Sequence, residues 1–469
     1  MKHKLGFWVL ILLVAVETAQ AQESGADGIG DSLYPCMGNG GYDVQHYTLE
    51  LRVDVMTNEI VGTTTLEAIA TQDLSAFNLD FNPLTIDAIQ VNDKSAEFDQ
   101  NGRELTVIPA AALPAGETFV VAVTYQGNPT ETAFGDEAEV VWRNDGDNIY
   151  AFEEPSAAWV WYPINDHPLD KATYTFRITV DAPYQVVMNG QLEDTIPQDD
   201  GTVTYIWQMD DPMASYLVTL NIVQDYVTQT AETAAGLPVM TYFPADKADD
   251  YEPIFARQAE MVEFFSDWFG PYPFESYGAL VVEAPIDFAL ETQTLSVFDP
   301  ETAADPEWGE SVVAHELSHQ WFGDNISVAD WQDIWLNEGF ATYAEALWDV
   351  EAGNYDSMAE AAEDWYAMLN EYEEGEITPP GSPTADDLFN DGVYLWGGLT
   401  LYALQLEVGD EAFFEILRTY VERYSGKNVT TADFIAVAEE LSGADLEEFF
   451  EDWLYAETLP DLPAASDDL

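Results

Sequence analysis

Two kinds of hydrophobic pattern divide this chain. From about residue 42 to residue 226, apolar and polar residues alternate along short segments. The alternation is clearest at residues 47–53, 63–69 and 173–180. A period of two is typical of half-buried β-strands, and the dipeptides Asn101-Gly102 and Asn189-Gly190 mark turns between them. This half is therefore predicted to form an antiparallel β-sandwich or a large curved sheet.

The second half follows a helical pattern. After strand-like stretches at residues 239–243 and 279–282, apolar residues recur three and four positions apart. Helices are predicted at residues 252–268, 310–322, 334–348, 358–369, 396–406, 411–424, 431–441 and 446–454. The chain is thus predicted to be an α+β protein of two domains. The β domain spans residues 41–235 and a mainly helical domain spans residues 236–456.

The first residues have the features of a targeting segment. Basic residues at 2–4 precede an apolar run at 5–16, and Ala19-Gln20-Ala21 is a typical cleavage site. We therefore predict a signal peptide over residues 1–21, cleavage before Gln22, and secretion to a periplasmic or extracellular space. No other stretch approaches the length of a membrane span without charges, so stable membrane insertion is not expected.

Two terminal segments have biased compositions. Residues 22–40 are rich in Gly and Asp and are predicted to be a flexible leader. Residues 457–469 are predicted to be an acidic tail. Cys36 is the single cysteine, which excludes an intrachain disulfide and a cysteine-based zinc site.

The charge balance restricts the partners. The chain has 88 Asp+Glu and 13 Lys+Arg, a formal net charge of −75. Such a chain repels nucleic acid and anionic lipid, so neither is expected as a partner. The acidity could attract cationic substrates or provide solubility in saline surroundings. Its spread along the whole chain favours solubility, and nothing in the sequence indicates the oligomeric state.

The most informative segment is His315-Glu316-Leu317-Ser318-His319. On a helix, positions four apart share a face, so two imidazoles can bind one ion while Glu316 reaches a water molecule on it. The chain has only 5 His, which makes a chance pair at this spacing improbable. After a gap that can hold a turn and the start of an antiparallel helix, Glu338 can return to the same ion. The alternative is a buried His pair satisfied by hydrogen bonds.

Two His and one carboxylate leave one position of a Zn²⁺ ion open for water, as in catalytic sites. The predicted site holds one Zn²⁺, bound by His315, His319 and Glu338. The ion lowers the pKa of its water molecule, and Glu316 is predicted to take the proton.

These residues and their flanks resemble the aminopeptidase N-like zinc metallopeptidases, a gluzincin family that includes leukotriene A hydrolase. The matching segments are 315–324 and Asn337-Glu338-Gly339-Phe340-Ala341, and the similarity extends over about residues 40–456. The resemblance implies a β domain followed by a thermolysin-like zinc peptidase domain. It also implies hydrolysis of the first peptide bond of peptides with a free N-terminus.

The resemblance implies two substrate-binding acids. The family motif G-A-M-E-N corresponds to residues 288–292, Phe-Ala-Leu-Glu-Thr, which keep the amine-binding carboxylate at Glu291. A second acid of the family lies nine residues before a Pro, which points to Glu154 ahead of Pro163, with Glu153 as the alternative. Phe152 stands where relatives usually have Gln, which leaves the preferred first residue of the substrate open.

The resemblance also assigns roles in the second half. Tyr394, in Tyr394-Leu395-Trp396-Gly397-Gly398, matches the catalytic Tyr that stabilises the oxyanion. Glu345, two helical turns after Glu338, matches the acid that orients a zinc-bound His. His167 is predicted to be structural, since nothing in the sequence brings it to the ion.

Many members of this family carry a further helical domain over the cleft, whereas this chain ends at Leu469. A more open cleft is therefore expected. The predicted function is that of a secreted zinc aminopeptidase. The alternatives are a zinc endopeptidase of the same clan, and a catalytically inactive binding protein on the same fold.

Overall fold

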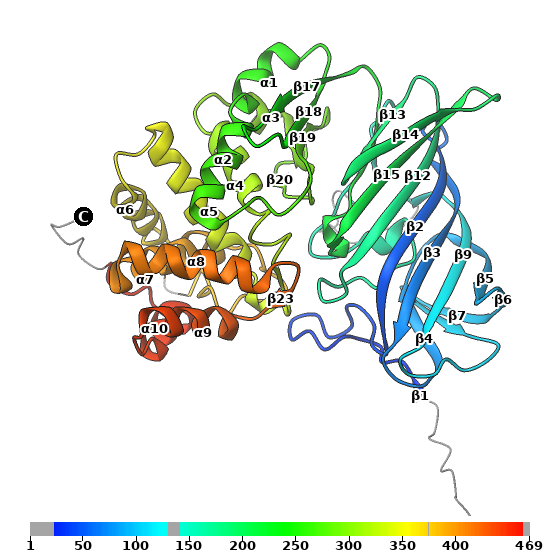
Figure 1. Cartoon of the computed structure of the whole chain (residues 1–469), viewed down its shortest axis with the longest axis horizontal. Coiled ribbons are helices and arrows are strands. Elements are labelled where there is room, and N and C mark those ends of the chain that lie inside the picture. Colours follow the sequence, from blue (N-terminus) through cyan, green and yellow to red (C-terminus); the bar gives the residue numbers. More distant parts are fainter. Residues whose placement is uncertain (1–22, 130–140, 374, 463–469) are drawn as a thin grey trace, which may run out of the picture.

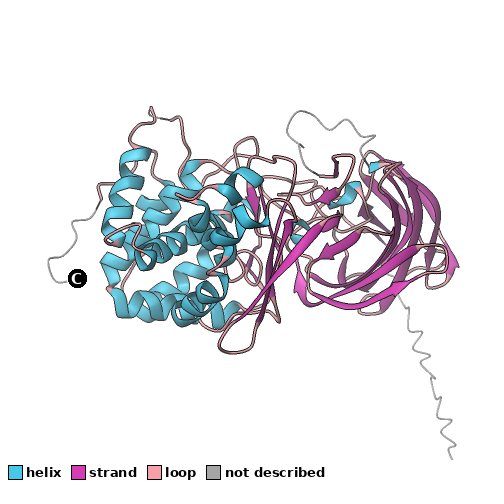
Figure 2. Ribbon diagram, turned by 90° about the horizontal axis from the view of Figure 1, so that it is seen from above, coloured by secondary structure: helices cyan, strands magenta, loops and turns pink. Residues whose placement is uncertain are grey.

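The computed structural model describes residues 23–129, 141–373 and 375–462. Figure 1 shows a half made of sheets beside a half made mainly of helices, and Figure 2 shows the same division from above. The predicted α+β class, with a mainly β first half and a mainly helical second half, is confirmed. The predicted signal peptide lies outside the described residues.

A curved eight-stranded sheet dominates the first half, in the order β14-β15-β12-β2-β3-β9-β5-β6. Only the pair β12–β2 is parallel. The strands are β2 (Tyr42–Asp54), β3 (Glu59–Ala70), β5 (Thr85–Val91), β6 (Lys94–Ser95), β9 (Thr118–Gly127), β12 (Ala172–Asp181), β14 (Gln191–Pro197) and β15 (Thr202–Met213). Buried and exposed residues largely alternate along β2 and β12, as the period of two predicted.

Two smaller sheets complete this half. One has the order β1-β4-β8-β7, formed by Glu23–Ser24, Leu74–Asp80, Glu104–Ile108 and Glu97–Asn101. The other has the order β10-β11-β16-β13, formed by Arg143–Asn144, Ile149–Ala151, Leu220–Val223 and Gln185–Met188. Short 3₁₀ turns lie at η2 (Ala158–Val160) and η3 (Ser215–Leu217).

Within residues 22–40, the prediction of a flexible leader is wrong for residues 23–40. Strand β1 pairs with β4, and Met37 and Asn39 are buried. Asp31 is buried and accepts a hydrogen bond from the backbone N–H of Trp331, 300 residues away. Contacts so distant in sequence leave no local periodic signal, and the small residues that suggested flexibility instead allow close backbone packing.

The second half begins with a mixed five-stranded sheet of order β17-β18-β19-β21-β20. Its strands are β17 (Tyr226–Glu232), β18 (Pro238–Pro244), β19 (Tyr277–Val281), β20 (Ala289–Leu290) and β21 (Ser296–Phe298). Strands β17 and β18 pair with each other across the predicted boundary between residues 235 and 236. That domain boundary stays a prediction.

Helices make up most of the second half. They are α1 (Ala248–Phe255), α2 (Gln258–Phe269), α3 (Pro300–Ala304), α4 (Gly309–Ser318), α5 (Trp335–Ala352), α6 (Met358–Leu369), α7 (Gly397–Val408), α8 (Asp410–Tyr424), α9 (Thr431–Ser442) and α10 (Glu447–Tyr455). A 3₁₀ turn η4 (Trp331–Asp333) precedes α5, a π-helical turn η5 (Gly392–Trp396) precedes α7, and β22 (Ser327–Val328) pairs with β23 (Asn428–Val429).

One predicted helix is divided. The pattern at residues 252–268 predicted a single helix, whereas the structure has α1 and α2 with a break at Ala256 and Arg257. The Arg257 guanidinium binds Glu310 of α4 and lies 4.3 Å from the ring centre of Trp348. These tertiary contacts occur at the break. They involve residues outside the segment, so the hydrophobic spacing within residues 252–268 could not predict them.

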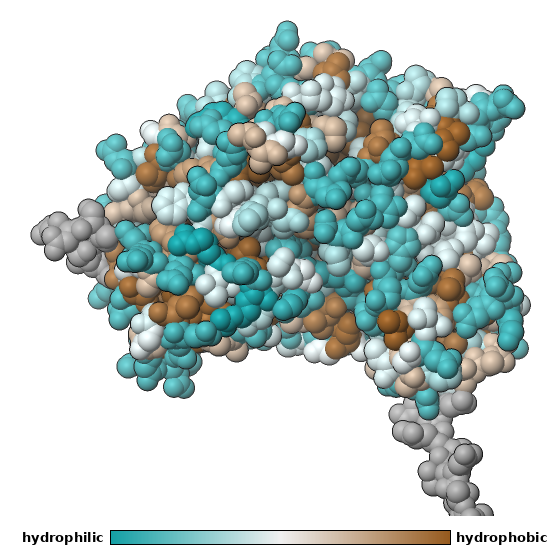
Figure 3. Space-filling model, in the orientation of Figure 1, coloured by the Kyte–Doolittle hydropathy of each residue, from teal (hydrophilic) through white to brown (hydrophobic). Residues whose placement is uncertain are grey.

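The face of the molecule shown in Figure 3 is mostly hydrophilic, with apolar residues scattered over it. No helix in the described parts of the chain is long and apolar enough to cross a bilayer.

Candidate active site

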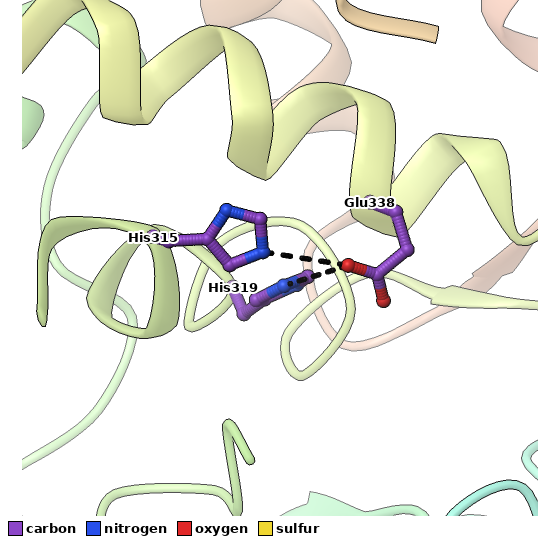
Figure 4. Close-up of side chains that lie close together, drawn as sticks. All are labelled: His315, His319 and Glu338. Atoms are coloured by element: carbon purple, nitrogen blue, oxygen red, sulfur yellow. Dashed lines mark ion pairs between the residues drawn. The ribbon is translucent and has the colours of Figure 1, made fainter. Parts of the chain in front are cut away.

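Helices α4 and α5 bring three potential metal ligands together. His315 lies in the last turn of α4, His319 caps its C-terminal end, and Glu338 lies in the first turn of α5. The Nε2 atoms of His315 and His319 lie 3.4 and 3.3 Å from the same Oε2 atom of Glu338 (Figure 4). His319 and Glu338 are buried, and 12% of the His315 side chain is exposed.

These distances fit a tetrahedral zinc ion. With metal–ligand bonds of about 2.0–2.1 Å, neighbouring ligand atoms of a tetrahedron are separated by about 3.3 Å. The donor set of two imidazoles and one carboxylate is the set that zinc takes in catalytic sites, with a fourth position left for water or substrate.

The other nitrogen of each imidazole has its own partner. Nδ1 of His315 lies 3.0 Å from Oε2 of Glu345, and Nδ1 of His319 lies 3.0 Å from the backbone oxygen of Phe322. Both partners are acceptors, so each Nδ1 carries a proton and donates it. When a ring carries only this proton, its Nε2 has a lone pair that can bind a metal ion.

The charges of the metal-free cluster compensate one another. Burial raises the pKa of Glu338, but the two neighbouring His outweigh it and hold that pKa at about 2. Burial lowers the pKa of His319, but Glu338 and Glu291 together raise it to about 9. Protons on the imidazoles thus compensate the carboxylates until a cation takes their place.

Glu316 follows His315 on α4 and lines a cavity of about 270 Å³ with the three ligands. Only 6% of the residue is exposed. Burial raises the pKa of its carboxyl group to about 8, although the neighbouring His315 and His319 lower it. Such a pKa suits a group that gives and takes protons near neutral pH.

Two further carboxylates face the cluster from separate elements. Glu291 follows β20, and Glu154 lies in the loop between β11 and η2. Carboxylate oxygens of Glu154, Glu291 and Glu338 lie within 4.8 Å of one another. Among the described residues, Oε1 of Glu154 and Oε1 of Glu291 have no hydrogen-bond partner although both atoms are buried. The alternative acid, Glu153, is buried but does not line the cavity.

This crowding favours a positive ligand. Burial raises the pKa of Glu291, and burial followed by repulsion from Glu291 and Glu338 raises the pKa of Glu154. Buried carboxylate oxygens without a hydrogen bond are costly, and an ammonium group between Glu154 and Glu291 would satisfy the Oε1 atom of each.

Tyr394 lies in the π-helical turn η5, and its ring stacks on His315 with ring centres 6.1 Å apart. Burial raises the pKa of the Tyr394 phenol well above 10, and the site carboxylates add to the shift. The phenol therefore stays protonated and is a hydrogen-bond donor inside the cavity. Turns of this π type are frequent at functional sites.

A close helix contact that the sequence prediction missed brings Tyr394 and Glu338 to the same cavity. An added Cβ on Gly339, the residue after Glu338, would lie 2.9 Å from Cα of Gly397. Two facing glycines therefore let α5 and the start of α7 approach closely. Gly339 and Gly397 each belong to a motif that resembles the family, but only the tertiary structure shows that the two residues face each other.

A second missed feature holds the loop that carries Glu291. Thr294 has a φ of 66°, an unusual value for a β-branched residue. Its N–H donates to Oε1 of Gln320 (2.7 Å), and its Oγ1 accepts from the N–H of Gly190 (2.7 Å). The Asn189 amide donates to the backbone oxygen of Gln293 (2.8 Å). The turn between β13 and β14 thus positions a loop of the second half.

His167 is remote from the cluster, as predicted. Its Nδ1 accepts the N–H of Leu169 at 3.0 Å, so Nε2 carries the proton and donates to Oδ2 of Asp31 at 3.1 Å. The residue is fully buried and ties the N-terminal segment to the β half.

Comparison with known families agrees with this geometry. The Peptidase family M1 domain matches residues 255–453, and the Peptidase M1 N-terminal domain matches residues 43–217. The chain belongs to peptidase family M1. This M1 chain is 26% identical to human endoplasmic reticulum aminopeptidase 1 over 83% of its own length and 44% of that protein. It is 25% identical to Xenopus laevis leukotriene A-4 hydrolase over 84% of its own length and 67% of that protein.

Solved structures of the M1 family are similar over more of their length. An M1 zinc metallopeptidase from Deinococcus radiodurans is 34% identical, with a TM-score of 0.84 over 93% of this chain and 99% of that chain. A mutant of that enzyme bound to a Tyr-Ser-Ala substrate is 33% identical, with a TM-score of 0.84. The present M1 chain spans about half the length of the aminopeptidases among its curated relatives.

Proposed function

We propose that this M1 family member is a zinc aminopeptidase that removes the first residue from peptides with a free N-terminus. The observation that carries the proposal is the pair of buried Oε1 atoms of Glu154 and Glu291, both without a hydrogen-bond partner in the described part of the chain, beside the cluster of His315, His319 and Glu338. An α-ammonium group held by the pair leaves space for one residue before the scissile bond reaches the metal position. This arrangement favours removal of a terminal residue over internal cleavage.

His315, His319 and Glu338 hold one Zn²⁺ ion in this proposal. When bound, zinc polarises the scissile carbonyl group and lowers the pKa of water. Glu345 positions His315 by accepting its Nδ1 proton, at the observed distance of 3.0 Å. The expected content is one zinc ion per chain.

Glu316 is the proposed general base and acid. Its carboxylate takes a proton from the attacking water molecule and delivers it to the nitrogen of the leaving amine. Its position in the cavity beside the three proposed metal ligands supports this role. Tyr394, protonated at all working pH values, donates a hydrogen bond to the oxyanion that develops at the carbonyl.

We also propose that the protein acts after export. The basic and apolar start of the chain and the Ala19-Gln20-Ala21 site support removal of residues 1–21. Mass spectrometry of protein exported by a bacterial host would give a mature start at Gln22. An unprocessed chain retained in the cytoplasm would contradict this part of the proposal.

One assay tests the activity. A peptide is supplied in free and N-acetylated form to the zinc-loaded mature protein, with and without a chelator. Release of the first residue from the free form only, abolished by chelator and restored by zinc, is the expected result. Internal cleavage of the acetylated form would identify an endopeptidase instead. Absence of any cleavage would favour a binding protein.

The matched variants separate the roles. Glu316→Gln should bind zinc but lose at least about a hundredfold in kcat, since one proton-transfer group contributes about 10²–10⁴. Glu291→Gln should keep the metal and raise KM for free peptides. Its discrimination against the acetylated form should fall at the same time. If Glu291→Gln left that discrimination intact, the amine-binding role would be wrong.

A further inference from the structure

A groove separate from the catalytic cavity opens where the two halves meet. Its volume is about 840 Å³, about three times that of the catalytic cavity, and the two share no lining residue. Helix α2, the β17–β18 turn and the loop before β19 form most of its walls, and Gln191 of β14 comes from the β half. Ligand sites occur preferentially at such junctions and at such volumes.

The floor of the groove is apolar. Leu237, Val262, Pro271 and Tyr272 are its apolar lining residues, and of these Val262 is buried and Pro271 is exposed. Val262 belongs to the buried face of α2, and Tyr272 packs against Trp321 with ring centres 5.2 Å apart. The part of the floor formed by Val262 and Tyr272 is therefore preformed, so a ligand would not have to order it.

The rim carries only negative charge. Glu263, Asp267 and Glu275 are exposed on it, and no Lys, Arg or His is among the lining residues. Gln191 donates to Oε2 of Glu275 at 2.7 Å, which holds that carboxylate across the junction.

Acidic residues alone would not mark a site, since the chain has 88 of them. The distinguishing feature is their position around a concave apolar floor. Lys and Arg side chains match that combination, because their aliphatic stems cover apolar surface while their charged ends reach carboxylates. The exposed turn at Ala234, Ala235 and Gly236 adds main-chain groups along one wall.

We propose that this groove binds a basic, amphipathic peptide segment, in which Lys or Arg alternates with apolar residues. Nucleic acid, anionic lipid and a second copy of this chain are disfavoured as occupants, because each would bring more negative charge to the rim. Binding here requires neither metal nor catalysis and does not rest on the proposed function.

The groove lies close to the loop that carries Glu291. The hydroxyl of Tyr272, a lining residue of the groove, is 3.4 Å from Oε1 of Gln320, and the Gln320 amide donates to the backbone oxygen of Glu291 at 3.0 Å. One side chain therefore connects the groove wall to that loop. A bound basic segment would lie within the same part of the molecule as the catalytic cleft, without entering it.

The test is isothermal titration calorimetry of the full mature protein with the peptide N-acetyl-Lys-Leu-Lys-Leu-amide at about 0.15 M NaCl, where long-range attraction is screened. Both ends of this probe are blocked, so the amine-binding acids have no ammonium group to hold. Saturable one-to-one binding is expected. The variant Glu263→Gln/Asp267→Asn/Glu275→Gln should bind about tenfold more weakly, as the loss of three exposed ion pairs implies.

Three controls make the test decisive. The variant Glu97→Gln/Asp99→Asn/Glu117→Gln removes the same charge from an exposed part of the β half and should change binding by less than about twofold. The probe N-acetyl-Lys-Gly-Lys-Gly-amide lacks the apolar side chains and should bind about tenfold more weakly. Glu291→Gln should leave probe binding unchanged.

Several outcomes would overturn the proposal. Absence of saturable binding would exclude the site. Equal weakening by both triple variants would mean that only the overall field attracts the probe. Loss of binding in Glu291→Gln would place the probe in the catalytic cavity. Equal binding of the Leu and Gly probes would mean that the floor does not participate.

Discussion

At the scale of single residues, the second partner of each imidazole decides whether the cluster can bind a metal. Glu345 accepts the Nδ1 proton of His315 at 3.0 Å, and the Phe322 carbonyl does the same for His319 at 3.0 Å. These contacts select the tautomer and the ring orientation. One contact depends on a side chain and the other on the backbone, so only the first can be removed by substitution.

We expect Glu345→Gln to lower zinc affinity about ten- to a hundredfold, because the His315 Nδ1–H would lose a charged acceptor. Competition with a chromophoric chelator measures the affinity, and excess zinc should restore activity. Glu351→Gln, an exposed acid on the same helix, is the matched control. Equal affinities of Glu345→Gln and the unsubstituted protein would show that Glu345 does not position the ligand.

The metal-free protein should lose stability as pH rises. The pKa of His319 is about 9 in the folded chain, against an ordinary value of 6.5, because Glu338 and Glu291 outweigh burial. The folded state therefore binds this proton more tightly than the unfolded state. The stabilisation is complete below about pH 6.5 and is lost as pH rises through 9, amounting to roughly 3 kcal/mol.

Thermal unfolding of chelator-treated protein between about pH 6 and pH 9.5 checks this. The melting temperature should fall across that range, and His319→Gln should show a smaller fall. Zinc-loaded protein should also show a smaller fall, because the bound ion replaces the proton. A pH-independent melting temperature in the chelated protein would rule out the assigned coupling.

At the scale of elements, the site depends on how closely two helices approach. Gly339 of α5 faces Gly397 at the start of α7. Glu338 precedes the first of these residues, and Tyr394 lies one helical turn before the second. The spacing between the proposed metal ligand Glu338 and the Tyr394 phenol is therefore determined by a contact between two residues without side chains.

Gly339→Ala would place a methyl group 2.9 Å from the backbone of Gly397. We expect a loss of about 1–3 kcal/mol in the free energy of unfolding, as in other overpacked contacts. Activity should fall beyond the loss of stability, because Glu338 and Tyr394 would separate. Urea unfolding and the kcat of the folded fraction measure the two effects, with Glu351→Ala as the control on the exposed face of α5. A stable, fully active Gly339→Ala protein would contradict this role.

At the scale of the whole molecule, residues 23–40 join the two halves. Asp31 accepts hydrogen bonds from Trp331 N–H (2.8 Å) in the helical half and from His167 Nε2 (3.1 Å) in the β half. Burial raises the pKa of Asp31, but the bonds from His167 and Trp331 outweigh it and lower that pKa. The carboxylate is thus a charged link between the halves.

We expect Asp31→Ala to destabilise the protein by about 1–3 kcal/mol for each buried donor that it leaves without an acceptor, the N–H groups of His167 and Trp331 among them. Denaturant unfolding measures the change, and Asp199→Ala, at an exposed acid, should be nearly neutral. Unchanged stability of Asp31→Ala would show that the segment is not a structural link.

The net charge of −75 should make stability depend on salt. Repulsion among the acids opposes the compact state and is screened as ionic strength rises. The melting temperature should therefore rise from about 0.05 M to about 1 M NaCl, with a comparable rise in KCl. A melting temperature that falls or stays constant over this range would mean that the acids are already compensated.

The sequence by itself determined the features that depend on local spacing. Alternation in β2 and β12 predicted strands, because side chains of a strand point to opposite faces in turn. The pattern His315-Glu316-x-x-His319 predicted a metal-binding helix face, because residues four apart on a helix are neighbours. Glu338 could also be predicted as the third ligand, because the short gap after His319 can hold a turn and the start of an antiparallel helix that returns to the same ion.

The tertiary structure alone decided the features that join distant segments. It placed Glu154, and not the adjacent Glu153, in the lining of the cavity, divided the predicted helix at Arg257, and placed Asp31 between the two halves. It also decided that Gly339 of α5 faces Gly397 of α7, and that the turn between β13 and β14 holds the loop of Glu291. Each depends on contacts between segments far apart in the chain, and the periodicity of either segment contains no information about the other.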